Sequence, residues 1–189
     1  MTTVFISGSM RIKNIHPQVC KRIENIIKSA FDIVIGDADG VDTSIQAFLK
    51  AKSYKRVVIY CSGQHVRNNL GSWPVEMVFT DERNNTRKFY TAKDIEMAKK
   101  CDYGLMIWDS KSTGTLNNVI QLLTQEKRSL VFVNKSKSFV TVTDIMDFEN
   151  LISVMSDNAL QKADKKISLK EKITEFKQGN LFNCSGISL

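Results

Sequence analysis

The sequence predicts one α/β domain in which a parallel β-sheet carries helices on both faces. Short apolar runs alternate with stretches whose apolar residues recur at helical spacing, which is typical of strands joined by crossover helices. The runs are apolar at every position, as expected for strands buried on both sides. The 189 residues are 42% hydrophobic and 25% charged, which is enough for one complete core.

The first half of the chain contains three predicted strands and two predicted helices. A strand over Thr3–Ile6 ends at a Ser-Gly-Ser bend, and a helix with one apolar face follows over Pro17–Ala30. The second strand covers Asp32–Ile35, and the helix after it covers 41–49. Val57–Tyr60 is the third strand, because it is a β-branched run without polar interruption.

The second half begins with a long polar stretch from Ser62 to about Thr91, with room for a short strand at Val75–Phe79. Connections of this length in compact domains are usually functional or mobile. The elements predicted after it are a helix over Ala92–Cys101, a strand over Tyr103–Trp108, a helix over Gly114–Gln125 and a strand over Ser129–Val133. The predicted sheet therefore has five parallel strands.

After Asn134 the pattern changes to polar helices, predicted at about Asp144–Met155 and Ser168–Phe176. We interpret residues 135–189 as a helical appendage packed on the domain formed by residues 1–134. No low-complexity tract or internal repeat separates the two parts.

Composition narrows the class of protein. The formal net charge is +7, but the excess lies in scattered lysines, so a solvated surface is favoured over a DNA footprint. The cysteines show neither a C-x-x-C pair nor zinc spacing, so no metal or cofactor is predicted; they are Cys20, Cys61, Cys101 and Cys184. Without a signal peptide or a membrane-length apolar run, we expect a cytoplasmic protein with no membrane partner.

Three bends of small residues follow strands whose carboxyl ends meet at one edge of the predicted sheet: Ser7-Gly8-Ser9, Gly36–Gly40 and Asp109–Thr115. Glycines let a ligand approach the backbone, and the helix N-terminus after each bend favours an anion. Open α/β sheets bind ligands at this edge. Any one bend is ordinary in an α/β protein, but three together predict a phosphate site, with Lys111-Ser112-Thr113-Gly114-Thr115 the best cradle.

Acidic residues beside the second bend are candidates for binding a ribose. Asp37 and Asp42 could accept hydrogen bonds from sugar hydroxyls, whereas Asp39 is the better candidate for a helix cap. Gly36 and Gly40 belong to the same bend as these carboxylates, so they are also candidate ligand-binding residues.

Charged residues of the long polar stretch and the helix after it are further candidates. Arg83 and Asn84 could form a lid over a phosphate, since a guanidinium matches phosphate oxygens, or they could be exposed to solvent. Lys93 and Asp94 could form a surface ion pair or reach the ligand.

These segments together resemble the SLOG superfamily of Rossmann-like proteins, which includes lysine-decarboxylase-like phosphoribohydrolases, DprA-like proteins and YspA/YpsA-related proteins. The run Gly36–Asp42 is similar to the family's G-G-A-x-G-x-D element, and Lys111–Thr115 is similar to its G-G-x-G-T loop. The resemblance spans about Thr2 to Val133 and is nearest to a bacterial subgroup through Phe89–Asp94 and Tyr103–Ser112.

The resemblance implies a nucleotide-derived ligand with its phosphate near Gly114 and Thr115, and cleavage of an N-glycosidic bond. The phosphoribohydrolases carry a glutamate three residues after the loop threonine, where this chain has Asn118. An amide cannot replace a carboxylate base, so Asn118 is predicted to contact the ligand, and Asp94 or Asp109 would have to be the catalytic residue.

Three functions are compatible with the sequence. The first is a module that binds or senses a nucleotide or ribose-phosphate at the carboxyl edge of the sheet. The second is an enzyme acting on an N-glycosidic bond, as a nucleotide hydrolase or a nucleoside deoxyribosyltransferase. The third is a nucleic-acid-binding protein, suggested by the net charge of +7 and the resemblance to DprA-like proteins. The sequence favours the first, and assembly into homo-oligomers stays open.

Overall fold

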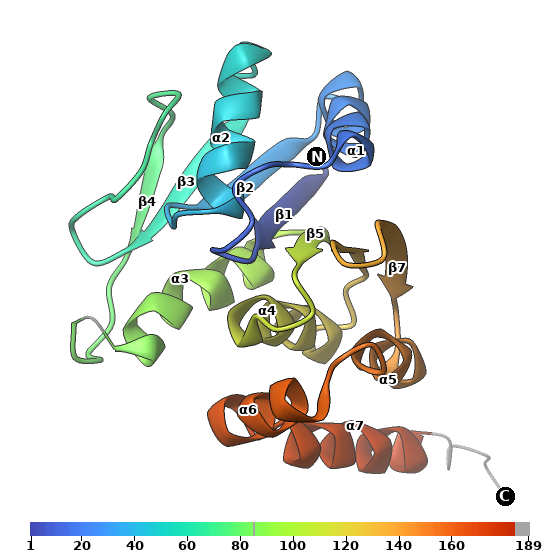
Figure 1. Ribbon diagram of the computed structural model, residues 1–189. Coiled ribbons are helices and arrows are strands. Elements are labelled where there is room, and N and C mark those ends of the chain that lie inside the picture. Colours follow the sequence, from blue (N-terminus) through green and yellow to red (C-terminus); the bar gives the residue numbers. More distant parts are fainter. Residues whose placement is uncertain (85, 184–189) are drawn as a thin grey trace, which may run out of the picture.

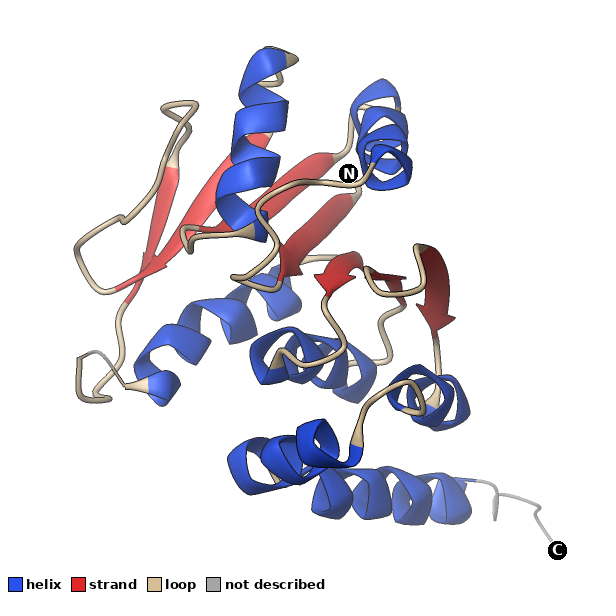
Figure 2. Cartoon of the chain, viewed as in Figure 1, coloured by secondary structure: helices blue, strands red, loops and turns tan. Residues whose placement is uncertain are grey.

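The computed structural model describes residues 1–84 and 86–183, which form one mixed sheet between layers of helices (Figures 1 and 2). The strands are β1 (Thr3–Gly8), β2 (Asp32–Gly36), β3 (Val57–Ser62), β4 (Val75–Val78), β5 (Tyr103–Trp108), β6 (Ser129–Val133) and β7 (Ser138–Val142). They lie in the order β4-β3-β2-β1-β5-β6-β7. Neighbouring strands are parallel, except that β7 is antiparallel to β6. The strand order reverses between β1 and β5.

Helices cover both faces of the sheet. They are α1 (Pro17–Lys28), α2 (Val41–Ala51), α3 (Arg87–Lys100), α4 (Thr113–Thr124), α5 (Ile145–Ile152), α6 (Asp157–Ile167) and α7 (Leu169–Asn183). In Figure 1, α1 and α2 lie on one face, α3 and α4 lie on the other, and α5 to α7 lie beyond α4. Alternate residues of β1 enter the two cores: Ile6 packs into the core on the α1 and α2 side, and Phe5 packs into the other.

The five predicted strands are confirmed, but the sheet has seven strands rather than five. The short strand predicted at Val75–Phe79 is present as β4. The additional strand β7 follows a turn at Lys137, which has φ of 53°, and most of its residues are only partly buried. A half-exposed strand lacks the continuous apolar run that reveals a buried one, so the sequence analysis assigned this segment to a helical appendage.

Two helices also differ from the prediction. Helix α3 begins at Arg87 rather than Ala92, because the Thr86 side chain accepts a hydrogen bond from the Phe89 N–H (3.2 Å) and caps it. Helix α6 was not predicted, since its buried face consists largely of small residues, Ala159 and Ala163. Alanine gives a weak apolar signal for a helix face.

Two further predictions from the sequence concern membrane-spanning segments and the pairing of cysteines. Among the described residues, no helix has the length and apolar character that crossing a bilayer requires. Cys20, Cys61 and Cys101 are free thiols, and Cys184 lies outside the described residues.

Gly40 gives a test of the turn that leads into α2. It has φ of 79°, and a Cβ there would lie 2.3 Å from the Met10 carbonyl oxygen. We expect Gly40→Ala to lower the free energy of unfolding by about 3 kcal/mol, through backbone strain and overlap. Urea unfolding followed by circular dichroism measures this.

Gly114→Ala is the matched control. A Cβ at Gly114 meets only Ser112 Oγ, at 3.9 Å, and the residue lies in the first turn of α4. This variant should be as stable as the wild type, or more stable by about 0.5 kcal/mol. Equal destabilisation by both changes would contradict the explanation given for Gly40.

Candidate functional site

A pocket of about 850 Å³ opens at the carboxyl edge of the sheet, beside the ends of β1 and β5. It is bounded by the starts of α2, α3 and α4 and by one side of α6. Many of the predicted site residues line it: Ser7, Gly8, Asp42, Asp94, Asp109, Lys111, Ser112, Gly114, Thr115 and Asn118. Reversal of the strand order leaves a crevice at this point, because the adjoining helices cover opposite faces of the sheet.

Hydrogen bonds made by the buried Ser9, Ser7 and Asn118 side chains bring the first and third bends together. Ser9 Oγ accepts from the Asp109 N–H (3.1 Å) and lies 3.5 Å from Thr115 Oγ1. Asn118 Nδ2 donates to Ser7 Oγ (3.1 Å). The end of β1 is therefore held against the start of α4, with Ser9 behind the pocket rather than on its surface.

The bend before α4 is held by its own side chains. Asp109 Oδ1 accepts from the Lys111 N–H (3.0 Å) and the Ser112 N–H (2.7 Å), and Ser112 Oγ accepts from the Thr115 N–H (3.4 Å). The amides of Thr113 and Gly114 belong to the first helical turn and lie at the pocket. Amides at this position lack intrahelical partners, so this end of α4 can receive an anion.

The second bend contributes an aspartate to the site. Its buried carboxylate pairs with an arginine and holds that side chain in place. Asp37 is buried, and it accepts hydrogen bonds from Arg67 Nε (3.1 Å), Nη2 (2.6 Å) and the Arg67 N–H (3.1 Å). Burial opposes the charge of Asp37, but these hydrogen bonds outweigh it and lower its pKa. The guanidinium of Arg67 lies 4.7 Å from the centre of the Tyr90 ring, and both residues line the pocket.

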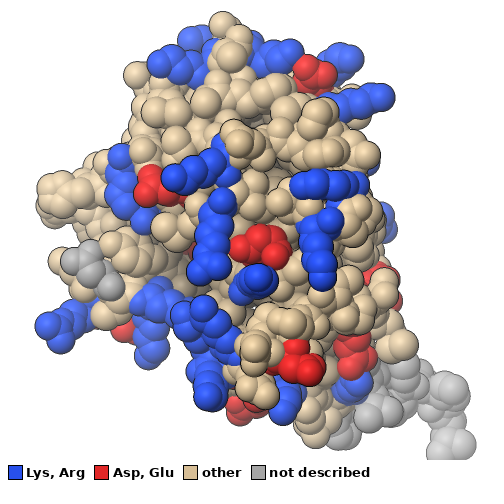
Figure 3. All heavy atoms as spheres, in the orientation of Figure 1, with Lys and Arg blue, Asp and Glu red and all other residues tan. Residues whose placement is uncertain are grey.

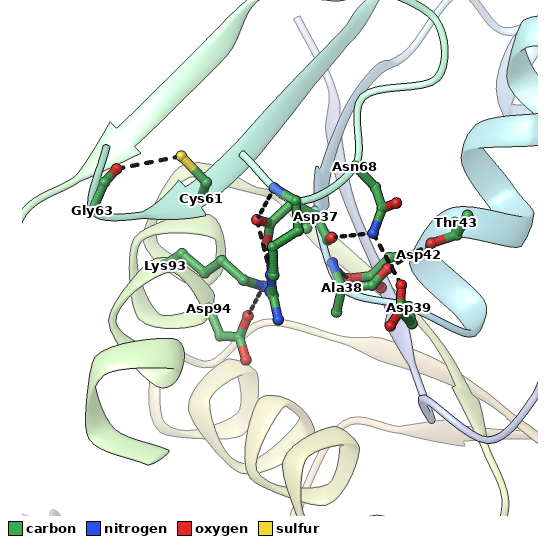
Figure 4. A network of polar contacts seen from close by, with 12 residues as sticks. Asp37, Ala38, Asp39, Asp42, Thr43, Cys61, Gly63, Asn68, Lys93 and Asp94 are labelled. Carbon is green, nitrogen blue, oxygen red and sulfur yellow. Dashed lines mark hydrogen bonds and ion pairs between the residues drawn. The ribbon is translucent and has the colours of Figure 1, made fainter. Parts of the chain in front are cut away.

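Lys93 reaches from α3 to the end of β2, where Asp37 and Asp42 lie (Figure 4). Its side chain is almost fully buried, and Nζ is 2.8 Å from Asp94 Oδ1. Burial alone would lower the pKa of Lys93, but the carboxylates of Asp94 and Asp42 raise it, so the ammonium keeps its charge. A Cβ on Gly36 would lie 2.5 Å from both Lys93 Nζ and Asp42 Oδ2, so a larger residue there would displace one of these side chains.

Asp42 is the most perturbed acid at the pocket. It is 3% exposed, and its Oδ2 accepts from the Ala38 N–H (3.3 Å) while its Oδ1 has no hydrogen-bond partner within the described residues. Burial raises its pKa to about 7, an effect that the nearby Lys93 ammonium reduces. No group of three or more His, Cys, Asp or Glu side chains in the described ranges could hold a metal ion.

Basic side chains from five parts of the chain surround the pocket. Apart from the buried Lys93, the basic residues that line it are Arg11, Arg67, Arg87, Lys111, Lys162 and Lys166, which we call the cationic rim. Figure 3 shows Lys and Arg side chains grouped around an acidic patch near the middle of this face. The acidic residues that line the pocket are Asp42, Asp94 and Asp109. Positive charge therefore surrounds a more acidic interior.

Several predicted residues lie outside the pocket lining. Arg83 and Asn84 are exposed in the loop before α3, and Arg87 in the first turn of that helix lies at the pocket instead, donating to Thr113 Oγ1 (3.3 Å). Gly36 and Asp37 lie behind the pocket and support it.

The residue that begins α2 also differs from the prediction. Gly40 is its N-cap, whereas Asp39 is exposed and accepts from Asn68 Nδ2 (3.1 Å). Gly40 is buried and does not line the pocket.

Most residues of the cationic rim could not be predicted from the sequence. Arg67 lies in the long polar stretch, where no periodic pattern marks it. Lys162 and Lys166 lie on α6, which was not predicted. For Arg87 a usable signal existed, because threonine is a common helix N-cap and Thr86 comes directly before it.

Comparisons with known proteins support the fold. No family model and no curated protein matches this sequence. DNA processing protein A from Helicobacter pylori is similar in structure, with 15% identity and a TM-score of 0.53 over 85% of this chain and 80% of that one. DNA processing protein A (DprA) from Streptococcus pneumoniae is also similar, with 16% identity and a TM-score of 0.54 over 85% of this chain and 61% of that one.

Both neighbours are DprA proteins, and at this identity the likeness shows the fold alone. It supports the predicted Rossmann-like α/β fold. No family model or curated protein supports the phosphoribohydrolase or the YspA/YpsA subgroup, so the resemblance to the superfamily and to a subgroup stays a prediction.

The buried acid Asp42 predicts a pH effect on stability. The folded chain holds the Asp42 proton up to about pH 7, whereas the ordinary pKa is 3.8. Between these values the unfolded chain binds fewer protons, so the contribution of Asp42 to stability is lost as the pH rises. Relative to Asp42→Asn, the wild type should lose roughly 2 kcal/mol of unfolding free energy between about pH 4 and pH 7.

Urea unfolding of both proteins across this range measures the difference. Asp37 is present in both, so its titration largely cancels in the comparison. A difference that does not change with pH would show that Asp42 titrates as an ordinary carboxyl.

Proposed function

We propose that the chain binds single-stranded nucleic acid, with the sugar-phosphate backbone crossing the pocket and its phosphates on the cationic rim. The observation that carries this proposal is the distribution of the rim over separate elements. Arg11 follows β1, Arg67 lies between β3 and β4, Arg87 begins α3, Lys111 precedes α4, and Lys162 lies on α6 with Lys166. The rim offers six cations, more than a single phosphate can pair with, whereas a chain of phosphates can engage them all.

Three further observations support a nucleic-acid ligand, and the first of them favours it over the isolated nucleotide that the sequence favours. The Helicobacter pylori neighbour binds single-stranded DNA. The pocket also includes Tyr90, an aromatic side chain of the type on which bases stack in single-strand sites. Amides at the start of α4 add a contact that no simple basic surface provides.

Neutralising the rim should weaken binding and reduce its dependence on salt. We expect the triple variant Arg87→Ala, Lys111→Ala and Lys166→Ala to bind a fluorescent single-stranded oligonucleotide about 10- to 100-fold more weakly than wild type at low salt. Its plot of log affinity against log salt concentration should be shallower by about 2, since each lost phosphate contact removes about 0.7. Fluorescence anisotropy at several salt concentrations measures both.

The control removes three lysines that lie away from the pocket. Lys28 and Lys50 are in the last turns of α1 and α2, and Lys55 is exposed just before β3, so all three lie toward the amino edge of the sheet. Changing all three lysines to alanine lowers the net charge by as much as the rim triple variant does. The slope of log affinity against log salt concentration should nevertheless stay near that of wild type. If both triple variants lose affinity for the oligonucleotide equally, binding depends on net charge alone. That result would contradict a specific role of the cationic rim.

The second candidate function is that of an enzyme that cleaves the N-glycosidic bond of a free nucleotide. The carboxylates within the pocket favour this function. Asp94 and Asp109 both line the pocket. If the chain is such an enzyme, incubation with a panel of nucleotides releases free base, and the double variant Asp94→Asn, Asp109→Asn does not. An amide oxygen at position 109 can still accept from the Lys111 and Ser112 amides, so the α4 bend is preserved. Base release that continues in the double variant would exclude this mechanism.

A further inference from the structure

We propose that two copies of this chain associate through their β4 strands, which pair antiparallel about a two-fold axis at Met77. The pairing joins the sheet of one copy to the sheet of the other. This inference goes beyond the proposed function and does not rest on it. β4 forms one edge of the sheet (Figure 1), with β3 and β2 between it and β1, whereas the pocket opens beside β1 and β5.

The backbone of β4 is paired on one side only. The carbonyl oxygens of Pro74 and Val78 each accept a hydrogen bond from the β3 side, at 2.9 Å. Successive residues of a strand direct their backbone groups to opposite sides, so Val75, Met77 and the N–H of Phe79 point away from β3. No other described segment pairs with these groups, because β4 is the last strand of the sheet.

The side chains along this edge are apolar and exposed. Met77 is 43% exposed and Phe79 is 70% exposed. Val75 packs against the core on the α1 and α2 side, and side chains alternate along a strand, so Met77 lies on the same face of the sheet. Monomeric proteins protect such an edge with proline or charged residues. In β4 the charged residue is Glu76, whose backbone groups face β3, so the unpaired positions stay apolar.

The edge is complementary to itself when two copies run antiparallel. With the axis at Met77, each Met77 exchanges both backbone hydrogen bonds with Met77 of the second copy, and each Phe79 N–H donates to the Val75 carbonyl of the other. Apolar side chains then lie opposite apolar side chains on one face. On the other face Glu76 lies opposite Val78, so the two glutamates are not directly opposed.

This self-match is the reason to assign the edge to a second copy rather than to a strand of another protein. In a two-fold interface the same patch serves both copies, so a run of residues must fit its own reverse. The run from Val75 to Phe79 meets that requirement in its backbone groups and in its side chains.

The association should be weak and reversible. β4 contains four residues, whereas a standard stable interface uses roughly 20–30 residues a side. We therefore expect a dissociation constant of roughly 10–100 μM for the dimer. Sedimentation velocity of the full chain at increasing concentration measures it, and the mass should rise from the 21.4 kDa of one chain toward twice that value.

Met77→Lys tests the axis, because it places two ammonium groups opposite each other and removes the contact between the methionines. It should weaken the dimer by about tenfold. Met146→Lys is the matched control: Met146 is 69% exposed on α5, so the same substitution away from β4 should leave association as in wild type. Circular dichroism of both variants checks that they are folded.

Mixing two variants tests whether position 77 faces itself. Met77→Lys and Met77→Glu each place like charges opposite one another, so each alone should associate weakly. An equimolar mixture should associate to within about threefold of wild type, because opposite charges then meet across the axis. Only a second copy paired in this register brings position 77 to itself.

Three results would overturn the proposal: a wild type that stays monomeric, a Met77→Lys variant that associates as wild type does, or a mixture that fails to recover. The last would assign the edge to another register or to a strand of another protein. Met77→Lys leaves the cationic rim unchanged and should bind the oligonucleotide as wild type does. Failure of the dimer therefore leaves the proposed function standing, and failure of oligonucleotide binding leaves the dimer standing.

Discussion

The buried ammonium of Lys93 is the interaction on which the site depends. A charge that is 4% exposed is tolerated only where partners surround it. Asp94 pairs with it directly at 2.8 Å, and Asp42 and Asp37 add their fields from α2 and the end of β2. This requirement couples α3, on one face of the sheet, to α2, on the other, across the end of a strand. The coupling is possible because Gly36 leaves the space that the ammonium and the Asp42 carboxyl occupy.

The second constraint is the reversal of strand order between β1 and β5. The chain leaves these neighbouring strands toward opposite faces, so their bends would separate if nothing joined them. Ser9 closes that gap through the Asp109 amide, and the Asn118 amide reaches back to Ser7. Residues that resemble ligand contacts in the sequence are thus partly structural. Ser9 and Asp37 shape the pocket from behind, while Ser7 and Asp42 contribute to its surface.

Most of the fold could be predicted from the sequence because the central strands are buried on both sides. β1, β2, β3, β5 and β6 are continuous apolar runs, and such runs have few alternative structures. The edge strand β7 and helix α6 were missed for a shared reason. Each buries only part of its surface, through Phe139 and Val142 in one and through Ala159 and Ala163 in the other.

The candidate site was predictable where local chemistry determines it and not where long-range packing does. A bend such as Ser112-Thr113-Gly114-Thr115 indicates a helix start and an anion site from its own residues. Which arginine of the polar stretch reaches the pocket is decided elsewhere: Arg67 does so because Asp37, thirty residues earlier, binds it at three points. Within the described part of the chain Arg83 forms no such ion pair, and nothing in its sequence neighbourhood distinguishes it from Arg67.

The arrangement of charge within the pocket bears on how a ligand would be oriented. Asp42, Asp94 and Asp109 line the interior, whereas the cationic rim is carried by exposed side chains at its mouth. A phosphate is repelled by the carboxylates and attracted by the rim and the α4 amides, so it should stay at the mouth. In the proposed function, the uncharged parts of the ligand then face inward. The acidic residues would thus contribute to recognition even without chemistry, because they exclude phosphates from the interior of the pocket.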